Sequence, residues 1–132
     1  MADKEFNKSL FHLMYYNNLN KQFEREVGDY LRANTNTPKN YSNDLRHQYV
    51  SALYSRNFGD NTAKTLGNLN EFFNFNASGR DDTAIDQINN EIGRNYGSQY
   101  PDIPRSKLMD ILFNDYDKNL QIRKDKMKEL GF

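Results

Sequence analysis

The sequence predicts an all-α fold, a single compact domain of about five helices, from three observations. Apolar residues recur at three- and four-residue steps along most of the chain, which is the spacing of helices. Turn signals fall between these periodic segments and not at the short intervals of an all-β fold. The nine Phe and nine Tyr residues supply the burial that a hydrophobic content of 36% would otherwise limit. We therefore expect one domain over residues 1–132 with an aromatic-rich core.

The first predicted helix runs from about Lys4 to Ala33, and a break into two helices near residues 17–20 stays open. A polar loop is expected over residues 34–40, because Asn and Thr compete for backbone hydrogen bonds and Pro38 has no backbone donor. The second helix is expected to begin with Ser42 or Asn43 as its cap. It should end at Phe58, where Gly59 can adopt a left-handed backbone.

A third helix is expected from Asp60 or Asn61 to about Phe75, followed by a loop over residues 76–80. The fourth should begin near Asp81 or Asp82, and its apolar residues recur at helical steps until Gly97 ends it. Pro101 and Pro104 predict a short connector. The fifth helix is expected from about Arg105, with a solvated, basic-rich end over residues 123–128.

Charge and residue usage exclude several classes of protein. Eighteen basic residues balance eighteen acidic ones, which argues against an extended nucleic-acid surface. The chain has no Cys, so disulfides, thiolate metal sites and Cys nucleophiles are excluded. No apolar run is long enough for a membrane span, and the first residues lack the apolar part of a signal peptide. We expect a cytoplasmic chain as synthesised, with export without a cleaved signal peptide left open.

The fourth predicted helix carries the strongest indication of a site. Opposite its isoleucines, one stripe combines short polar residues, a glycine and a single arginine. An interior glycine costs about 1 kcal/mol relative to alanine, so we expect close packing against it. Asp86 could act as a base or metal ligand, Asn89 or Asn90 could orient a carbonyl, and Arg94 could hold an anion. The alternative is a buried hydrogen-bond network between helices, with Arg94 paired to Asp86 or to a loop carbonyl.

Two other helices supply further candidates. Arg46 and His47 lie in the second helix, and the pKa of a histidine is close enough to neutrality for proton transfer. Glu71 precedes two Phe residues in the third helix, where burial would raise the pKa of its carboxyl. The alternatives are a hydrogen-bonded structural histidine and an exposed helical glutamate. His12, beside Phe11, is a weaker candidate than His47.

Three segments together resemble an uncharacterised bacterial domain family. Its hallmarks are an Arg-His pair, a Gly-Asp-x-His-Glu segment and an Asp-x-x-Asn-Asn-x-x-Gly-Arg helix, which correspond here to segments at 44–53, 66–71 and 86–94. The resemblance covers roughly residues 43–97. Such domains are similar to C-terminal modules of secreted, toxin-like bacterial proteins, which implies an enzymatic role. Asn68 and Asn70 stand where the family pattern has Asp and His, so this copy would be impaired if that His were a metal ligand or base.

Two functions are therefore expected from the sequence. The first is a small hydrolase-like or toxin-like domain with a polar site at a three-helix junction, acting on an unknown small molecule. The second is a non-catalytic helical interaction module, such as a phage-encoded inhibitor of a host protein. The sequence specifies no cofactor and no metal site. The candidate catalytic residues are His47, Glu71 and Asp86, and the candidate binding residues are Arg46, Asn89, Asn90 and Arg94.

Overall fold

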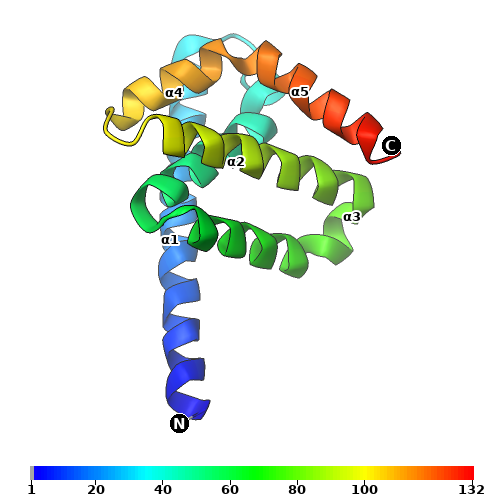
Figure 1. Cartoon of the computed structure of the whole chain (residues 1–132). Helices are drawn as coiled ribbons and strands as arrows, with labels where there is room; N and C mark the ends of the chain where they lie inside the picture. Colours follow the sequence, from blue (N-terminus) through cyan, green and yellow to red (C-terminus); the bar gives the residue numbers. More distant parts are fainter. Residues whose placement is uncertain (1) are drawn as a thin grey trace.

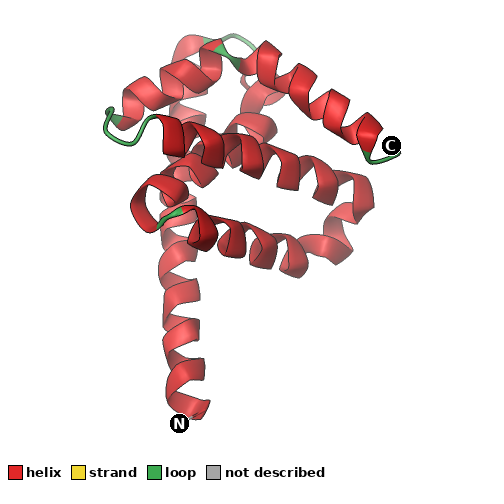
Figure 2. Ribbon diagram, viewed as in Figure 1, coloured by secondary structure: helices red, strands yellow, loops and turns green. Residues whose placement is uncertain are grey.

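The computed structural model gives the backbone from residue 2 to residue 132 and describes the side chains of residues 15, 17–66 and 82–132. Over the described backbone the fold is all-α, without strands, as the sequence predicts (Figures 1 and 2). None of its helices, judged on the described residues, is long and apolar enough to cross a membrane. In chain order the helices are α1 (Ala2–Asn34), α2 (Pro38–Phe58), α3 (Asp60–Gln99), α4 (Arg105–Asn114) and α5 (Tyr116–Glu129).

The connections around α2 are shorter than the sequence predicts. α1 is one continuous helix, and the loop after it covers only residues 35–37. α2 begins at Pro38 and not at Ser42 or Asn43, because proline is well tolerated in the first turn, where its missing N–H is not needed. The predicted role of Gly59 is confirmed: it follows α2 with a positive φ of 90°.

The third and fourth predicted helices form one element, α3, and the loop expected over residues 76–80 is helical backbone. A straight helix of 40 residues would be about 60 Å long. Nevertheless the side chains of Asp60 and Arg94 lie 3.6 Å apart. α3 is therefore bent back on itself into a first leg, which starts at Asp60, and a second leg, which ends at Gln99 (Figure 1).

The second leg of α3 and α2 run in the same sense and touch through their backbones. A Cβ atom added to Gly93 would lie 2.1 Å from the carbonyl oxygen of Gln48, and one added to Gly97 would lie 2.4 Å from that of Ala52. Both glycines therefore allow direct contact between the two helices, as the sequence predicts for Gly93. The expectation that Gly97 ends a helix is wrong, because the helix continues to Gln99 and Gly97 is a packing residue.

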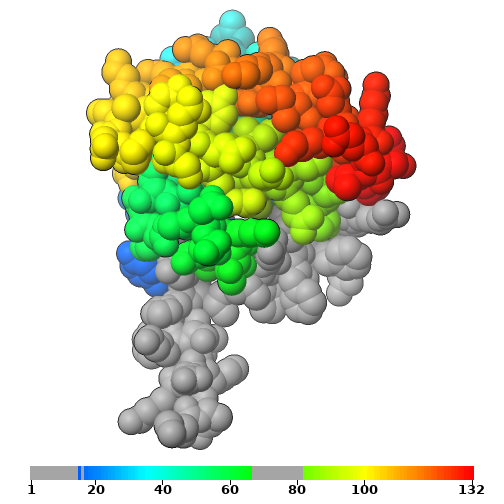
Figure 3. Space-filling model, in the orientation of Figure 1, coloured from blue at the N-terminus to red at the C-terminus, as the bar shows by residue number. Residues whose placement is uncertain are grey.

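The fifth predicted helix begins at Arg105, as expected, but Asp115 divides it into α4 and α5. These two helices form the upper side of the view in Figure 3, above the second leg of α3. α4 also contacts α2, and α5 contacts the second leg. α4 and α5 therefore pack against α2 and the second leg of α3.

The core is rich in aromatic residues, as predicted, and also contains fully buried leucines. Phe23 packs edge to face against Tyr49, with ring centroids 6.4 Å apart. Four tyrosine hydroxyls donate hydrogen bonds to carboxylates on other elements, so aromatic burial and polar pairing occur together. These bonds are Tyr30 to Asp110, Tyr49 to Glu26, Tyr96 to Asp115 and Tyr116 to Asp44.

The glycine contact predicts opposite effects of the same substitution at two positions. We expect Gly93→Ala to destabilise the protein by about 1–3 kcal/mol, because the new methyl group would overlap a backbone oxygen. Gly28→Ala is the matched control. Its Cβ would meet only the guanidinium of Arg32, at 3.3 Å, so helix propensity should raise stability by up to about 1 kcal/mol. Urea unfolding measures both changes, and increased stability of Gly93→Ala would contradict the contact.

Candidate functional site

His47 lies at the interface between α2 and the second leg of α3. Its Nε2 is 3.3 Å from Oδ1 of Asp86, and its Nδ1 is 3.1 Å from Oδ1 of Asn90. The same Asn90 oxygen accepts a hydrogen bond of 3.0 Å from the hydroxyl of Ser51. Both ring nitrogens of His47 therefore face polar groups of the protein, and only 13% of the side chain is exposed.

Asn89, which is fully buried, connects the same two helices. Its amide donates a hydrogen bond of 2.6 Å to Asp44, and its oxygen accepts one of 3.0 Å from the Gln48 amide. Asn89 and Gln48 are almost completely buried. Burying an amide is costly unless it is hydrogen-bonded, so these bonds fix how the two helices align.

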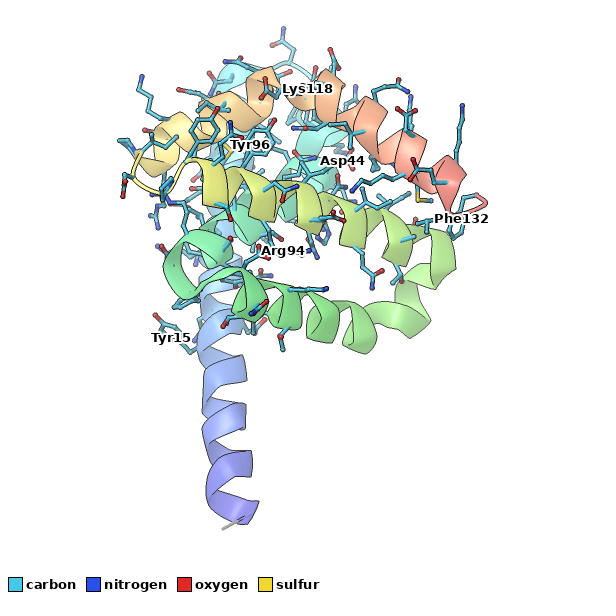
Figure 4. All side chains as sticks on the ribbon, viewed as in Figure 1. Tyr15, Asp44, Arg94, Tyr96, Lys118 and Phe132 are labelled. Carbon is cyan, nitrogen blue, oxygen red and sulfur yellow. The ribbon has the colours of Figure 1, made fainter. Side chains whose placement is uncertain are left out.

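Asp44 extends this network to α5. The carboxylate accepts a hydrogen bond of 3.0 Å from the hydroxyl of Tyr116, and the Nε of Arg123 lies 3.4 Å from it. Asp44 lies between α2 and α5 in Figure 4. Burial and the nearby Asp44 charge raise the pKa of Tyr116 to about 12, so its hydroxyl remains a donor at neutral pH.

Burial also sets the charge state of His47. Loss of solvent is the largest effect and lowers the pKa of the imidazole below its usual 6.5. The negative charge of Asp86 opposes this effect, and the positive charge of Arg46 reinforces it. Asn90 and Glu24 favour the protonated ring to a smaller extent. Burial therefore favours the neutral imidazole, which has one N–H and donates to only one of the two oxygens that it faces.

A cleft of about 460 Å³, which we call the Asp86 cleft, opens beside this network. Residues of α2, the second leg of α3 and α5 line it, so it lies at a junction of three helical segments. A chain of hydrogen bonds runs along the cleft from α2 to α3. Arg46 donates one of 2.9 Å to Asn43, and Asn43 donates one of 3.3 Å to Asp86. The lining residues are Asn43, Asp44, Arg46, Asp82, Ile85, Asp86 and Arg123.

Arg94 lies apart from Asp86. Its partner is Asp60, 3.6 Å away in the first leg of α3, and Arg94 lies between the two legs in Figure 4. Asp86 and Arg94 are eight positions apart in the helix, which is about 12 Å along the axis. The pairing with Asp86, one of the two partners considered for Arg94, is therefore wrong, because the ion pair is with Asp60. The side chain of Glu71, the third candidate catalytic residue, lies outside the described residues, as do those of Asn68 and Asn70.

A family model described as "Domain of unknown function (DUF6973)" matches residues 6–120 of the chain. The chain belongs to this family. The match is longer than the segment 43–97 on which the sequence resemblance depends, because it includes most of α1 and all of α4. No curated protein and no solved structure matches the chain.

The DUF6973 domain uses two residues that the sequence analysis did not select. Arg123 belongs to a stretch expected to be solvated, but its side chain is only 17% exposed because it packs against Asp44. Asn119, one helical turn before it, is buried with the hydroxyl of Tyr96 at 3.2 Å. A polar stripe at residues 116, 119 and 123 of α5 was the available sequence signal, since helical neighbours three or four residues apart share a face.

Metal binding has little support in the described part of this DUF6973 domain. Among the described side chains, no group of three His or carboxylate residues is placed to hold an ion. Asp86 is already engaged by His47 and Asn43 through its Oδ1. The arrangement therefore suits hydrogen bonding and ion pairing.

The lowered pKa of His47 predicts that stability falls in mild acid. Between the folded-state pKa and 6.5 the unfolded chain binds a proton that the folded chain does not, so the free energy of unfolding decreases as pH falls. We expect a lower urea midpoint at about pH 5.5 than at about pH 7.5. His47→Gln should reduce this difference, because it removes the buried imidazole. An unchanged difference in His47→Gln would contradict the burial of a neutral imidazole.

A second prediction compares two aspartates. Asp44→Ala removes the acceptor for Asn89 and Tyr116 and the partner of Arg123, so we expect it to destabilise the protein by about 3 kcal/mol. Asp29→Ala is the matched control, because Asp29 and its partner Arg32 are both exposed and the loss of this ion pair should cost less than about 1 kcal/mol. Equal effects in thermal or urea unfolding would show that the Asp44 network does not hold the helices.

Proposed function

We propose that the protein is a non-catalytic helical binding module whose polar motif residues hold its helices together. The observation that carries this proposal is that both ring nitrogens of His47 face groups of the protein, in a side chain that is only 13% exposed. A general acid or base must present a ring nitrogen to its substrate, directly or through one water. In His47 one nitrogen faces Asp86 and the other faces Asn90, both from α3.

The buried amides support the same function. A residue that orients a substrate must reach it, but Asn89 and Asn90 are buried and bonded to α2. These amides fix the alignment of two helices that also meet at Gly93. They therefore act as positioning residues for the surface that α2 and α3 present.

The Asp86 cleft is the proposed recognition surface. Arg46 is 41% exposed at its rim, and Asp82 is exposed on the opposite wall. A cleft with both signs of charge favours a polar protein segment that carries complementary charges. A ligand with charges of only one sign would be repelled by the cleft residues of that sign. We propose a host protein as the partner, which is the second of the two functions that the sequence predicts.

Hydrolase-like or toxin-like activity remains the second candidate, and one specific observation favours it. Asp86 lines the cleft, and the Nε2 of His47, a residue that does not line it, lies 3.3 Å from this carboxylate. A histidine can orient a carboxylate that acts as a base or nucleophile on a bound substrate. The two functions differ in what they require from the imidazole of His47.

Site-specific photo-crosslinking tests the binding function. A photoreactive amino acid in place of Asp82, at the cleft rim, should give a covalent adduct with a partner protein in the source cells. Lys107, which is exposed on α4 and does not line the cleft, is the matched control position and should give no such adduct. Equal crosslinking at the two positions would contradict a recognition surface in the cleft.

The His47→Gln variant then separates the two functions. With the purified partner, a folded His47→Gln protein should bind with an affinity within about twofold of the wild type, because glutamine keeps a hydrogen bond and the cleft keeps its charges. A catalytic domain would instead lose about 10²–10⁴-fold in rate in the same variant. Loss of a biological effect with binding intact would identify catalysis and would overturn the proposal.

A further inference from the structure

A second hollow, which we call the basic groove, lies between α1 and α2 on the other side of Arg46. It has a volume of about 540 Å³ and is separate from the Asp86 cleft except for that one arginine. Four cations line it, Lys21, Arg25 and Arg32 from α1 and Arg46 from α2. In a chain with zero formal net charge, this is a local concentration of positive charge.

The α1 wall of the groove has a regular spacing. Lys21, Arg25, Gly28 and Arg32 follow one another at steps of four, three and four residues, so they share one helix face. The stripe is about 16 Å long, which is three turns of helix. At its centre the guanidinium of Arg32 lies over Gly28, 3.3 Å from the position of an added Cβ atom, and Val27 is buried, so the groove presents mainly charged side chains to a ligand.

The cations of the stripe differ in how far they are neutralised. Arg46 lies 3.7 Å from Glu24, and Arg32 is paired with Asp29. Among the described residues, no carboxylate lies within ion-pair distance of Lys21 or Arg25. These two cations are therefore available for an anionic ligand, and Arg25 offers the planar donor geometry that suits a carboxylate.

The mixture of charges favours protein over nucleic acid. Glu24 lines the groove and Asp29 lies beside it, and both would repel a uniform chain of phosphates. A protein helix can instead place carboxylates opposite Lys21 and Arg25 and leave other positions neutral or basic. The two helices that line the groove also leave room for a helix laid along it.

From these observations we infer that the basic groove binds an acidic helix of a partner protein. Two carboxylates of that helix, spaced four residues apart, pair with Lys21 and Arg25. Binding here does not require that the Asp86 cleft bind anything. Failure of the crosslinking experiment at Asp82 and failure of the groove are therefore distinguishable.

Fluorescence anisotropy with the full chain tests the inference. The probe is a labelled alanine-rich helical peptide with Glu residues four apart. We expect it to bind at least about tenfold more tightly than a peptide with the same residues scrambled, because only the ordered peptide matches the stripe. A single-stranded DNA of equal charge should bind no better than the scrambled peptide. Absence of binding, or equal binding of the scrambled peptide or the DNA, would overturn the inference.

Variants locate the binding to the groove. Arg25→Glu should weaken peptide binding by about tenfold or more, and Lys118→Glu, the same charge change at an exposed position of α5, should leave it within about twofold. Lys118 lies at the upper edge of the view in Figure 4. Equal effects of Arg25→Glu and Lys118→Glu would contradict the inference.

Discussion

Direct backbone contact between α2 and the second leg of α3 is the constraint on which the rest of this structure depends. Two consecutive helices that run in the same sense need a segment that carries the chain back, and the first leg of α3 provides it. Gly93 and Gly97 bring the helix axes close enough for short side chains to bridge them. Asn, Asp, Ser, His and one Gln bridge the interface at this distance. The Asp86 cleft lies where the two helices meet α5.

Much of the fold and part of the site could be predicted from local spacing. The period of the apolar residues gave the fold class, and a glycine on a polar stripe indicated that Gly93 packs closely. The same stripe placed Asp86, Asn89 and Asn90 on one face, and α3 does direct them toward α2. Such features depend on neighbours within two helical turns, so a single sequence contains them.

Pairings across the chain could not be predicted in the same way. The partner of Arg94 is Asp60, 34 positions away in the sequence, and the partner of Arg123 is Asp44, 79 positions away in α2. Spacing along one helix does not determine which face of another helix it meets. Residues 76–80 illustrate a related difficulty, because Asn, Ser and Gly favour a loop but the backbone there remains helical.

The tyrosine–carboxylate bonds give the domain a distinctive chemistry in strong base. Burial and the adjacent carboxylates raise the pKa of Tyr96 and Tyr116 to about 12, and those of Tyr30 and Tyr49 are raised as well. A phenolate at any of these bonds would place two negative charges where one proton is now shared, so each hydroxyl resists ionisation while the helices stay together. The unfolded chain has no such restraint and gives up these protons near pH 10. Strong base therefore removes the protons of these four tyrosine hydroxyls when the protein unfolds. The ultraviolet absorbance of the phenolates then reports whether the helices are assembled.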